Sequence, residues 1–353
     1  MEVQIDYSLG PEAKEGSKVP MAKPQTEQQT SFVSSSVNNF GADSCIAHGT
    51  FPTFVGIGSM RCGSTWLYRV LQCHPDIRMG DLKEVDFFFF SRMLRHDLDW
   101  YEALFAPQQN GPKPIRGEIS PRYARLKRWQ VNRIATLLPD LRIILTLRHP
   151  IERMWSQTLY DFGRLGGRDV RKVRISEFLR QLERARSKLS ADYFRMVKIW
   201  SEAFGREAMY IGFFDQLRDD PQAYIDGVLK HIGASTAWEI PPQFIKKKVW
   251  ATKALVNHER EIPEVIEWYI ADQLLESTER LNEYLEGRVS HWVDELRTIQ
   301  GKTVLSWRIL KEVNRKLLSV PETLAYEAYH VFLDARFRLR WQQLEHSCLS
   351  RSR

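Results

Sequence analysis

Short apolar runs alternate with stretches of helical periodicity from residue 51 onward, and this alternation restricts the chain to few folds. The runs with the length of buried strands are TFVGIG (53–58), PIRGEI (114–119), RIILTLR (142–148) and AMYIGFF (208–214). The helical stretches that follow them are TWLYRVLQCH (65–74), WQVNRIATLL (129–138), IERMWSQTLYDF (151–162) and PQAYIDGVLKHIG (221–233). Strands that alternate with helices pair in parallel and are covered on both faces. The sequence therefore predicts an α/β fold, a doubly wound parallel sheet flanked by helices.

The two ends of the chain differ from this pattern. Residues 1–50 are rich in Ser, Gln, Asn and Pro and lack periodic apolar positions, which is typical of a flexible tail. Strand patterns stop after residue 234, and helical patterns dominate toward the C-terminus with a break at Pro321. We therefore expect a flexible tail over 1–50, an α/β domain over 51–295 and a helical C-terminal extension over 296–353.

The composition of the chain indicates which kinds of binding partner and which cellular compartment to expect. The 51 Lys and Arg against 44 Asp and Glu give a net charge of +7, which favours a nucleic acid, a membrane surface, or an anionic cofactor or substrate. The sequence contains no run of about 18 uncharged apolar residues, so it predicts no membrane-spanning helix. The N-terminus lacks the pattern of a signal peptide, and the four cysteines form no CxxC pair. We therefore predict a soluble, cytoplasmic protein with reduced thiols and no metal site.

The first predicted strand leads directly into the glycine loop GSMRCGST (58–65) and then into a helix. A strand, a GxxxxG-x-[ST] loop and a helix form a phosphate-binding loop, in which backbone N–H groups and the helix N-terminus face an anion. Nucleotide triphosphatases carry Lys where this chain has Ser64, and that lysine contacts the β- and γ-phosphates. The loop therefore favours an anion other than a triphosphate. For the loop alone, a tight glycine turn with Ser64 as the helix cap is an equally good interpretation.

A charged pair, Lys83 and Glu84, stands shortly before four consecutive phenylalanines at 87–90. Apolar rings beside a carboxylate exclude water from it, which favours Glu84 as a proton acceptor. The alternative is a solvated turn that leads into a buried strand.

A third motif, LTLRHPIERMWS (145–156), ends a strand at Arg148 and opens a helix at Pro150. Ligands of open α/β sheets bind at the carboxyl ends of strands, so we expect Arg148 beside the anion of the glycine loop. The alternative is an ion pair of Arg148 with Glu152, one helical turn ahead.

Together and in this order, the three motifs resemble those of sulfotransferases that use 3′-phosphoadenosine 5′-phosphosulfate (PAPS). The KE-x-x-FF element is most similar to that of heparan-sulfate and related carbohydrate sulfotransferases. GEISPRY (117–123) and FFDQLRDDPQAYIDGVLKHIG (213–233) also look like landmarks of the family. The resemblance covers roughly residues 53–293.

The resemblance implies a role for each matching residue. The residues implied to hold the 5′-phosphosulfate are Gly63, Ser64 and Thr65, with the loop at Arg61 and Cys62. Arg148 and Ser156 would bind the 3′-phosphate. Glu84 matches the general base, and Arg61 matches the cation that neutralises charge on the sulfuryl group. Trp66 and KKKVW (246–250) would contact cofactor or acceptor, although a triple lysine is more typical of a solvated face. The residues implied on the acceptor side are Lys83, Asp86 and Arg122.

Three positions depart from the pattern of the family. Arg61 stands where many members carry Lys, which keeps the positive charge but disfavours a role as proton donor. Asp86 stands where the heparan-type motif commonly has His, and Ile119 stands where some relatives have a substrate-contacting Lys. These departures favour an acceptor different from heparan sulfate.

The implied reaction is in-line transfer of a sulfuryl group from PAPS to a hydroxyl or amine. The acceptor would be a carbohydrate or another small or lipid-linked metabolite, the product adenosine 3′,5′-bisphosphate, and no nucleic acid would take part. Two alternatives stand beside it: a P-loop kinase or hydrolase with a displaced lysine, and a non-catalytic protein that binds sulfated or phosphorylated ligands. Ser64 disfavours the first, and Glu84 disfavours the second.

Two basic segments lie outside these motifs. Residues 303–346 contain amphipathic, basic helical patterns that are typical of peripheral membrane or partner contact, although such helices more often pack on their own domain. The segment GRLGGRDVRKVR (163–174) would either contact an anionic acceptor or form a solvated loop.

Overall fold

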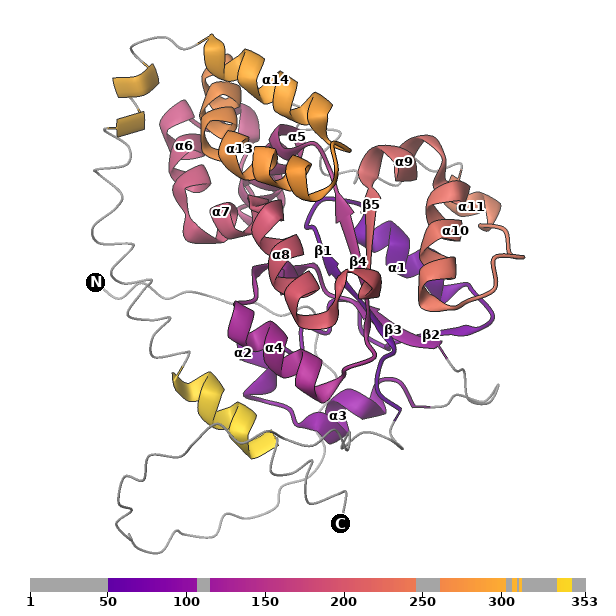
Figure 1. Cartoon of the computed structure of the whole chain (residues 1–353). Coiled ribbons are helices and arrows are strands. Elements are labelled where there is room, and N and C mark those ends of the chain that lie inside the picture. Colours follow the sequence, from indigo (N-terminus) through magenta and orange to yellow (C-terminus); the bar gives the residue numbers. More distant parts are fainter. Residues whose placement is uncertain are drawn as a thin grey trace, which may run out of the picture. The chain divides into compact units, whose positions relative to one another are not determined.

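The computed structural model describes residues 50–106, 115–245, 261–302, 307–309, 311–312 and 335–344. Its centre is a five-stranded sheet in the order β2-β3-β1-β4-β5 (Figure 1), and every neighbouring pair is parallel. The strands are β1 (Phe54–Gly58), β2 (Ile77–Met79), β3 (Ile115–Ile119), β4 (Arg142–Leu147) and β5 (Met209–Phe213). The sheet confirms the predicted α/β class. The apolar pattern did not indicate β2, which has only three residues.

Helices connect the strands and cover both faces of the sheet. Those that match the helical patterns of the sequence are α1 (Ser64–Gln72), α4 (Arg128–Leu137), α5 (Pro150–Tyr160) and α10 (Pro221–Ile232). The others that lie between strands are α2 (Phe90–Met93), α3 (Leu98–Ala103), α6 (Ile175–Glu183), α7 (Ala185–Ala191) and α8 (Tyr193–Phe204). Those that follow β5 are α9 (Phe214–Asp219), α11 (Pro242–Ile245), α13 (Glu264–Tyr284) and α14 (Ser290–Gly301). One turn of π-helix, η2 (Asp161–Leu165), extends α5.

The central strands β1 and β4 are apolar along most of their length because helices cover both faces of the sheet. Alternate side chains of a strand point to opposite faces. Val55 and Ile143 therefore join a core with α4 and α8, whereas Phe54 and Ile144 join a core with α1 and α10. Figure 1 shows these two pairs of helices on opposite sides of the sheet.

The described residues of the C-terminal region pack on the α/β domain. Phe337, Trp341 and Leu344 are buried in the core that contains α4 and α8. The ring of Trp307 lies 6.1 Å from that of Trp268 on α13, centroid to centroid. For these residues the structure agrees with the alternative in which the amphipathic helices of 303–346 pack on their own domain.

Other predictions for the two ends concern residues beyond this description. The tail at 1–49 and the remainder of 303–346 lie outside the described residues. Helix α14 runs through residue 295, where the sequence predicts a domain boundary. Among the helices in the described ranges, none is long and apolar enough to cross a bilayer.

The parallel arrangement gathers the loops that follow the strands along one edge of the sheet. The chain leaves β1 toward β2 on one side of the sheet and leaves β4 toward β5 on the other side. Because β1 and β4 are neighbours, the crevice between their carboxyl ends is the topological switch point, where open α/β sheets bind ligands. The glycine loop after β1 and Arg148 after β4 both lie at this point.

Candidate functional site

The glycine loop between β1 and α1 is tied to the neighbouring strand and helix. The Ser59 N–H donates to the Thr146 carbonyl of β4 at 2.9 Å. Gly63 has a φ of 83°, and a Cβ atom there would lie 3.0 Å from Leu217 Cδ1, so this position requires glycine. Gly63 is also the N-cap of α1, so the alternative in which Ser64 caps the helix is wrong. The first N–H groups of α1 have no acceptor within the helix and can bind an anion.

Arg61 lies in the middle of the loop and is fixed by α5. Its Nε donates to Ser156 Oγ at 3.1 Å, and its guanidinium lies 4.7 Å from the ring centroid of Tyr160. Its φ of 68° is unusual for a residue other than glycine. Burial lowers the pKa of Arg61, and the positive charge of Arg148 acts in the same direction. A negative charge at the loop would therefore be stabilised by a cation that water solvates poorly.

Arg148 joins this cluster from the end of β4. Its Nη1 donates to the Arg61 carbonyl at 3.5 Å, and its guanidinium lies 4.6 Å from the ring centroid of Phe214. Its Nε and Nη2 donate to Glu152 Oε2 at 3.1 and 2.9 Å, so the ion pair given as the alternative is also present. The structure thus brings together the predicted residues Arg61, Arg148 and Ser156.

A further arginine, Arg153 of α5, is buried next to the loop, and no sequence pattern indicated it. Its side chain is 1% exposed, and its Nε and Nη1 have no hydrogen-bond partner among the described residues. Its charge acts on the thiol of Cys62, whose pKa burial raises to about 11. A buried cation with unpaired donors is costly. In the sequence Arg153 follows Glu152 within a helix, which is typical of a solvated face.

Two other predicted cofactor contacts have side chains that point into the core. Cys62 Sγ lies 3.9 Å from Tyr193 OH, so only the backbone of Cys62 can face a ligand. Trp66 is 1% exposed, and its Nε1 donates to the Phe244 carbonyl at 3.1 Å. Contact of Trp66 with a cofactor stays a prediction. The predicted segment 246–250 lies outside the described residues.

The loop after β2 carries the predicted base at the same edge of the sheet. Lys83 Nζ and Glu84 Oε1 form an ion pair, and the side chain of Glu84 is 46% exposed. The expectation that apolar rings shield Glu84 is therefore wrong, because the chain becomes buried only from Val85 onward. Whether Glu84 acts as the base stays a prediction.

The shielded carboxylate of this loop is Asp86, which is 4% exposed. Burial raises the pKa of Asp86, and the positive charge of Arg122 opposes that shift. Arg122 Nη1 lies 2.9 Å from Asp86 Oδ2. Asp86 Oδ1 is buried without a hydrogen-bond partner among the described residues. The two predicted acceptor-side residues Asp86 and Arg122 are therefore a pair.

A buried carboxylate on β3 fixes the position of this loop. Glu118 is fully buried and accepts hydrogen bonds from Ser120 Oγ at 2.5 Å, Tyr101 OH at 2.6 Å and Tyr123 OH at 2.9 Å. Ser120 Oγ in turn accepts from the Asp86 N–H at 3.0 Å. Burial raises the pKa of Glu118 to about 7, although these three hydrogen bonds act against the shift. The only sequence signal was a glutamate inside the apolar strand of GEISPRY.

The edge of the sheet thus carries two kinds of charge. Arginines gather where β1 meets β4, and carboxylates follow β2. This arrangement can bind an anion at the switch point and offer a proton acceptor from the loop after β2. In the part of the chain that the structure describes, no three His, Cys, Asp or Glu side chains form a group that could hold a metal ion.

Comparison with known proteins identifies relatives of the chain. Residues 94–239 match the model of the sulfotransferase family, a span that includes Arg148 and Ser156 but not the glycine loop. The membrane-associated sulfotransferase kil1 of Dictyostelium discoideum is 33% identical over 113 residues, which are 32% of this chain and 23% of that protein. The bifunctional heparan sulfate N-deacetylase/N-sulfotransferase 1 of Mus musculus is 27% identical over 200 residues, and the match covers 53% of this chain and 22% of that protein. The chain thus spans less than a quarter of either relative.

A solved structure has the same fold. The sulfotransferase from Alicyclobacillus acidocaldarius matches with a TM-score of 0.53 and 22% sequence identity, covering 68% of this chain and 98% of that chain. At this identity the likeness shows the fold alone.

The burial of Glu118 predicts a dependence of stability on pH. Its folded-state pKa of about 7 lies above the ordinary value of 4.5. The stabilisation is therefore fully present below pH 4.5 and is lost as the pH rises through 7, since the folded protein then contains the buried anion. The loss amounts to ~3 kcal/mol at about 1.4 kcal/mol per pKa unit. Urea unfolding of the wild type at pH 5 and pH 8 should show this loss, and Glu118→Gln should lack most of it. The exposed Glu276→Gln is the control, and a full wild-type pH dependence in Glu118→Gln would refute the prediction.

Proposed function

The chain belongs to the sulfotransferase family, and on that premise we propose that it transfers a sulfuryl group from PAPS to a hydroxyl or amine of an acceptor. The observation that carries the proposal is the cluster of Arg61, Arg148 and Ser156, joined by hydrogen bonds at the switch point of the sheet. PAPS has phosphate groups on both sides of its ribose, so it needs cations on two elements. The glycine loop and the start of α5 provide them.

The residues present fit such a ligand. Arg153 has buried donors without a partner among the described residues, and Arg61 is a poorly solvated cation, so positive charge at the site exceeds what nearby groups compensate. We assign the 3′-phosphate to Arg148 and Ser156, and the 5′-phosphosulfate to the loop and the first N–H groups of α1. Arg148 would exchange Glu152 for the phosphate, a small cost because an exposed ion pair contributes about 1 kcal/mol or less.

The side chains divide the work of the reaction. PAPS supplies the sulfuryl group, and adenosine 3′,5′-bisphosphate is the product. Arg61 and the loop N–H groups stabilise the negative charge that grows on the leaving oxygen, which is usually the largest contribution to catalysis. Glu84 accepts the proton of the attacking hydroxyl or amine, and its ion pair with Lys83 orients the carboxylate. Ser64 leaves Arg61 as the cation of the loop.

For the acceptor we propose a carbohydrate or another small or lipid-linked metabolite. The names of two relatives support this class, since one is a heparan sulfate N-sulfotransferase and the other is membrane-associated. The candidates for acceptor contact are Asp86, two residues after Glu84 in the same loop, and Arg122, which follows the neighbouring strand β3.

Glu84→Gln should lower kcat by about 10²–10⁴-fold, because Gln cannot accept the proton. Transfer of labelled sulfate from PAPS would be measured with the acceptor that responds in a panel of glycans, lipids, phenols and peptides. Binding of adenosine 3′,5′-bisphosphate should stay unchanged, which shows that the cofactor site is intact. Glu276→Gln is the control, and unchanged kcat in Glu84→Gln at saturating acceptor would remove Glu84 from the role of base.

Arg148→Ala should weaken the preference for adenosine 3′,5′-bisphosphate over adenosine 5′-monophosphate. A hydrogen bond to a charged group contributes ~1.5–3 kcal/mol, which corresponds to about 10- to 100-fold in affinity. Calorimetric titration of both nucleotides gives the ratio. Arg142→Ala, at the opposite end of β4, is the control. An unchanged ratio in Arg148→Ala would show that Arg148 does not bind the 3′-phosphate.

A further inference from the structure

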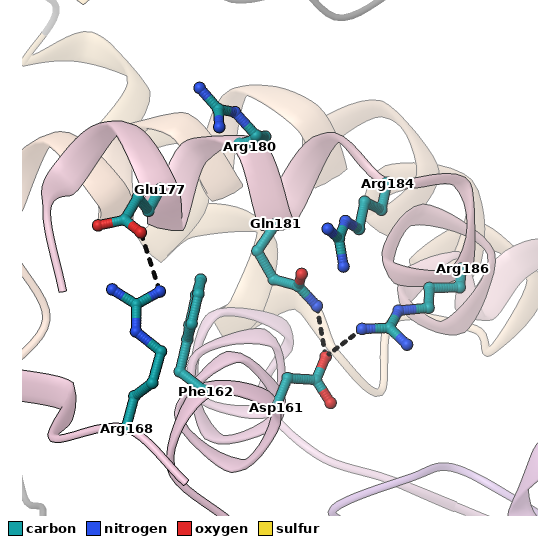
Figure 2. A pocket seen from close by; sticks show the side chains of 8 residues that line it. All are labelled: Asp161, Phe162, Arg168, Glu177, Arg180, Gln181, Arg184 and Arg186. Atoms are coloured by element: carbon teal, nitrogen blue, oxygen red, sulfur yellow. Dashed lines mark hydrogen bonds and ion pairs between the residues drawn. The ribbon is translucent and has the colours of Figure 1, made fainter. Parts of the chain in front are cut away.

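A pocket of about 220 Å³ opens beside the end of α5, and arginines dominate its lining (Figure 2). Arg168 follows η2, Arg180 belongs to α6, and Arg184 and Arg186 lie at the start of α7. The wider segment 161–188 contains nine Lys or Arg and four Asp or Glu, a net charge of +5. The net charge of this one segment, +5, is thus close to the net charge of the whole chain, +7.

The acidic side chains of the pocket are already occupied by internal contacts. Asp161 accepts hydrogen bonds from Gln157 Nε2 at 2.8 Å and Gln181 Nε2 at 2.5 Å, and Arg186 Nη2 lies 3.3 Å from its Oδ2. Glu177 lies at the other end of the pocket and accepts from Arg168 Nη1 at 2.9 Å (Figure 2). Each carboxylate therefore neutralises one arginine of the lining.

Arg180 and Arg184 are the two guanidinium groups of the lining that remain. Among the described residues, neither side chain has a hydrogen bond or an ion pair, and Figure 2 accordingly draws none for them. Phe162 adds an apolar wall, with the Arg168 guanidinium 5.3 Å from its ring centroid. The pocket therefore has two guanidinium groups without an internal partner in the part of the chain that the structure describes: Arg184, which points toward Gln181, and Arg180 at the rim, whose guanidinium points outward from α6 (Figure 2). Guanidinium groups bind planar or tetrahedral oxyanions most effectively.

The pocket adjoins the reaction centre through the last residues of α5. Tyr160 lies against the Arg61 guanidinium, and the next residue, Asp161, lines the pocket. The charge of Asp161 also acts on Arg61. A ligand with one group in the pocket can therefore extend past Asp161 and Tyr160 toward Arg61 of the glycine loop.

We propose that this pocket binds a sulfate, phosphate or carboxylate group that the acceptor already carries, so that the acceptor is acidic. The inference rests on the proposed function and narrows its substrate class. The anionic group binds to Arg180 and Arg184, and the hydroxyl or amine to be sulfated then lies toward Glu84 and Arg61. An acceptor without an anionic group loses this contact and binds more weakly.

Calorimetric titrations of protein saturated with adenosine 3′,5′-bisphosphate test the proposal, because that nucleotide blocks the glycine loop. The probe is N-acetylglucosamine 6-sulfate, and unsulfated N-acetylglucosamine is its neutral counterpart. The variant Arg180→Gln/Arg184→Gln should bind the sulfated sugar at least ~10-fold more weakly than the wild type, since two charge-assisted contacts are lost. The variant Lys230→Gln/Arg297→Gln removes the same charge from exposed residues of α10 and α14, outside the pocket, and should bind it like the wild type.

Three results would overturn the proposal. The first is no binding of the sulfated sugar to the wild type, or equal binding of the neutral sugar. The second is an equal loss in both double variants, which would indicate a general surface charge effect. The third is inorganic sulfate binding as tightly as the sulfated sugar, which would make the pocket a site for free anions. Failure of adenosine 3′,5′-bisphosphate to bind in the first step would instead count against the proposed function, and its binding to each variant shows that the variant is folded.

Discussion

The hydrogen bonds that join the glycine loop to β4 and α5 determine the arrangement of the rest of the site. The Ser59 N–H donates to the Thr146 carbonyl, and the Arg61 side chain donates to Ser156 Oγ. The Arg148 side chain donates to the carbonyl of Arg61. Two segments about 90 residues apart in the sequence thereby become one cationic surface at the switch point of the sheet. Because β1 and β4 are parallel neighbours, this surface forms only in the folded sheet, and its positive charge favours an anion.

Buried polar groups with incomplete pairing mark both sides of this surface. Such groups reduce stability, and proteins commonly retain them at functional sites. Arg153 next to the loop and Asp86 Oδ1 beyond β3 each lack partners among the described residues. Glu118, in contrast, has three hydrogen bonds and uses them to hold Ser120 against the backbone of Asp86. The buried charge of Arg153 adds positive potential beside the glycine loop, and the paired Glu118 keeps the loop after β2 in place.

The sequence alone predicted the strands and helices with strong apolar periodicity and the motifs at their ends. Buried parallel strands are continuous apolar runs, so β1, β3, β4 and β5 were predictable, whereas three-residue β2 was too short for such a run. The turn after β2 follows neither the period of a strand nor that of a helix. The pattern there predicted a carboxylate against apolar rings, but only the fold shows that it is Asp86 and not Glu84. Arg153 could not be distinguished from a solvated arginine, because only the fold buries it and brings its charge near Cys62 of the loop and Tyr193 of α8.

Calorimetric titration of the wild type with adenosine 3′,5′-bisphosphate, and separately with ATP and magnesium, tests the anion specificity of this surface most directly. Arginines on two elements and the absence of the loop lysine should make the bisphosphate bind without a metal, at least ~10-fold more tightly than ATP with magnesium, as a single charge-assisted contact implies. Equal or tighter binding of ATP with magnesium would show that the loop serves a triphosphate and would contradict the assignment of PAPS.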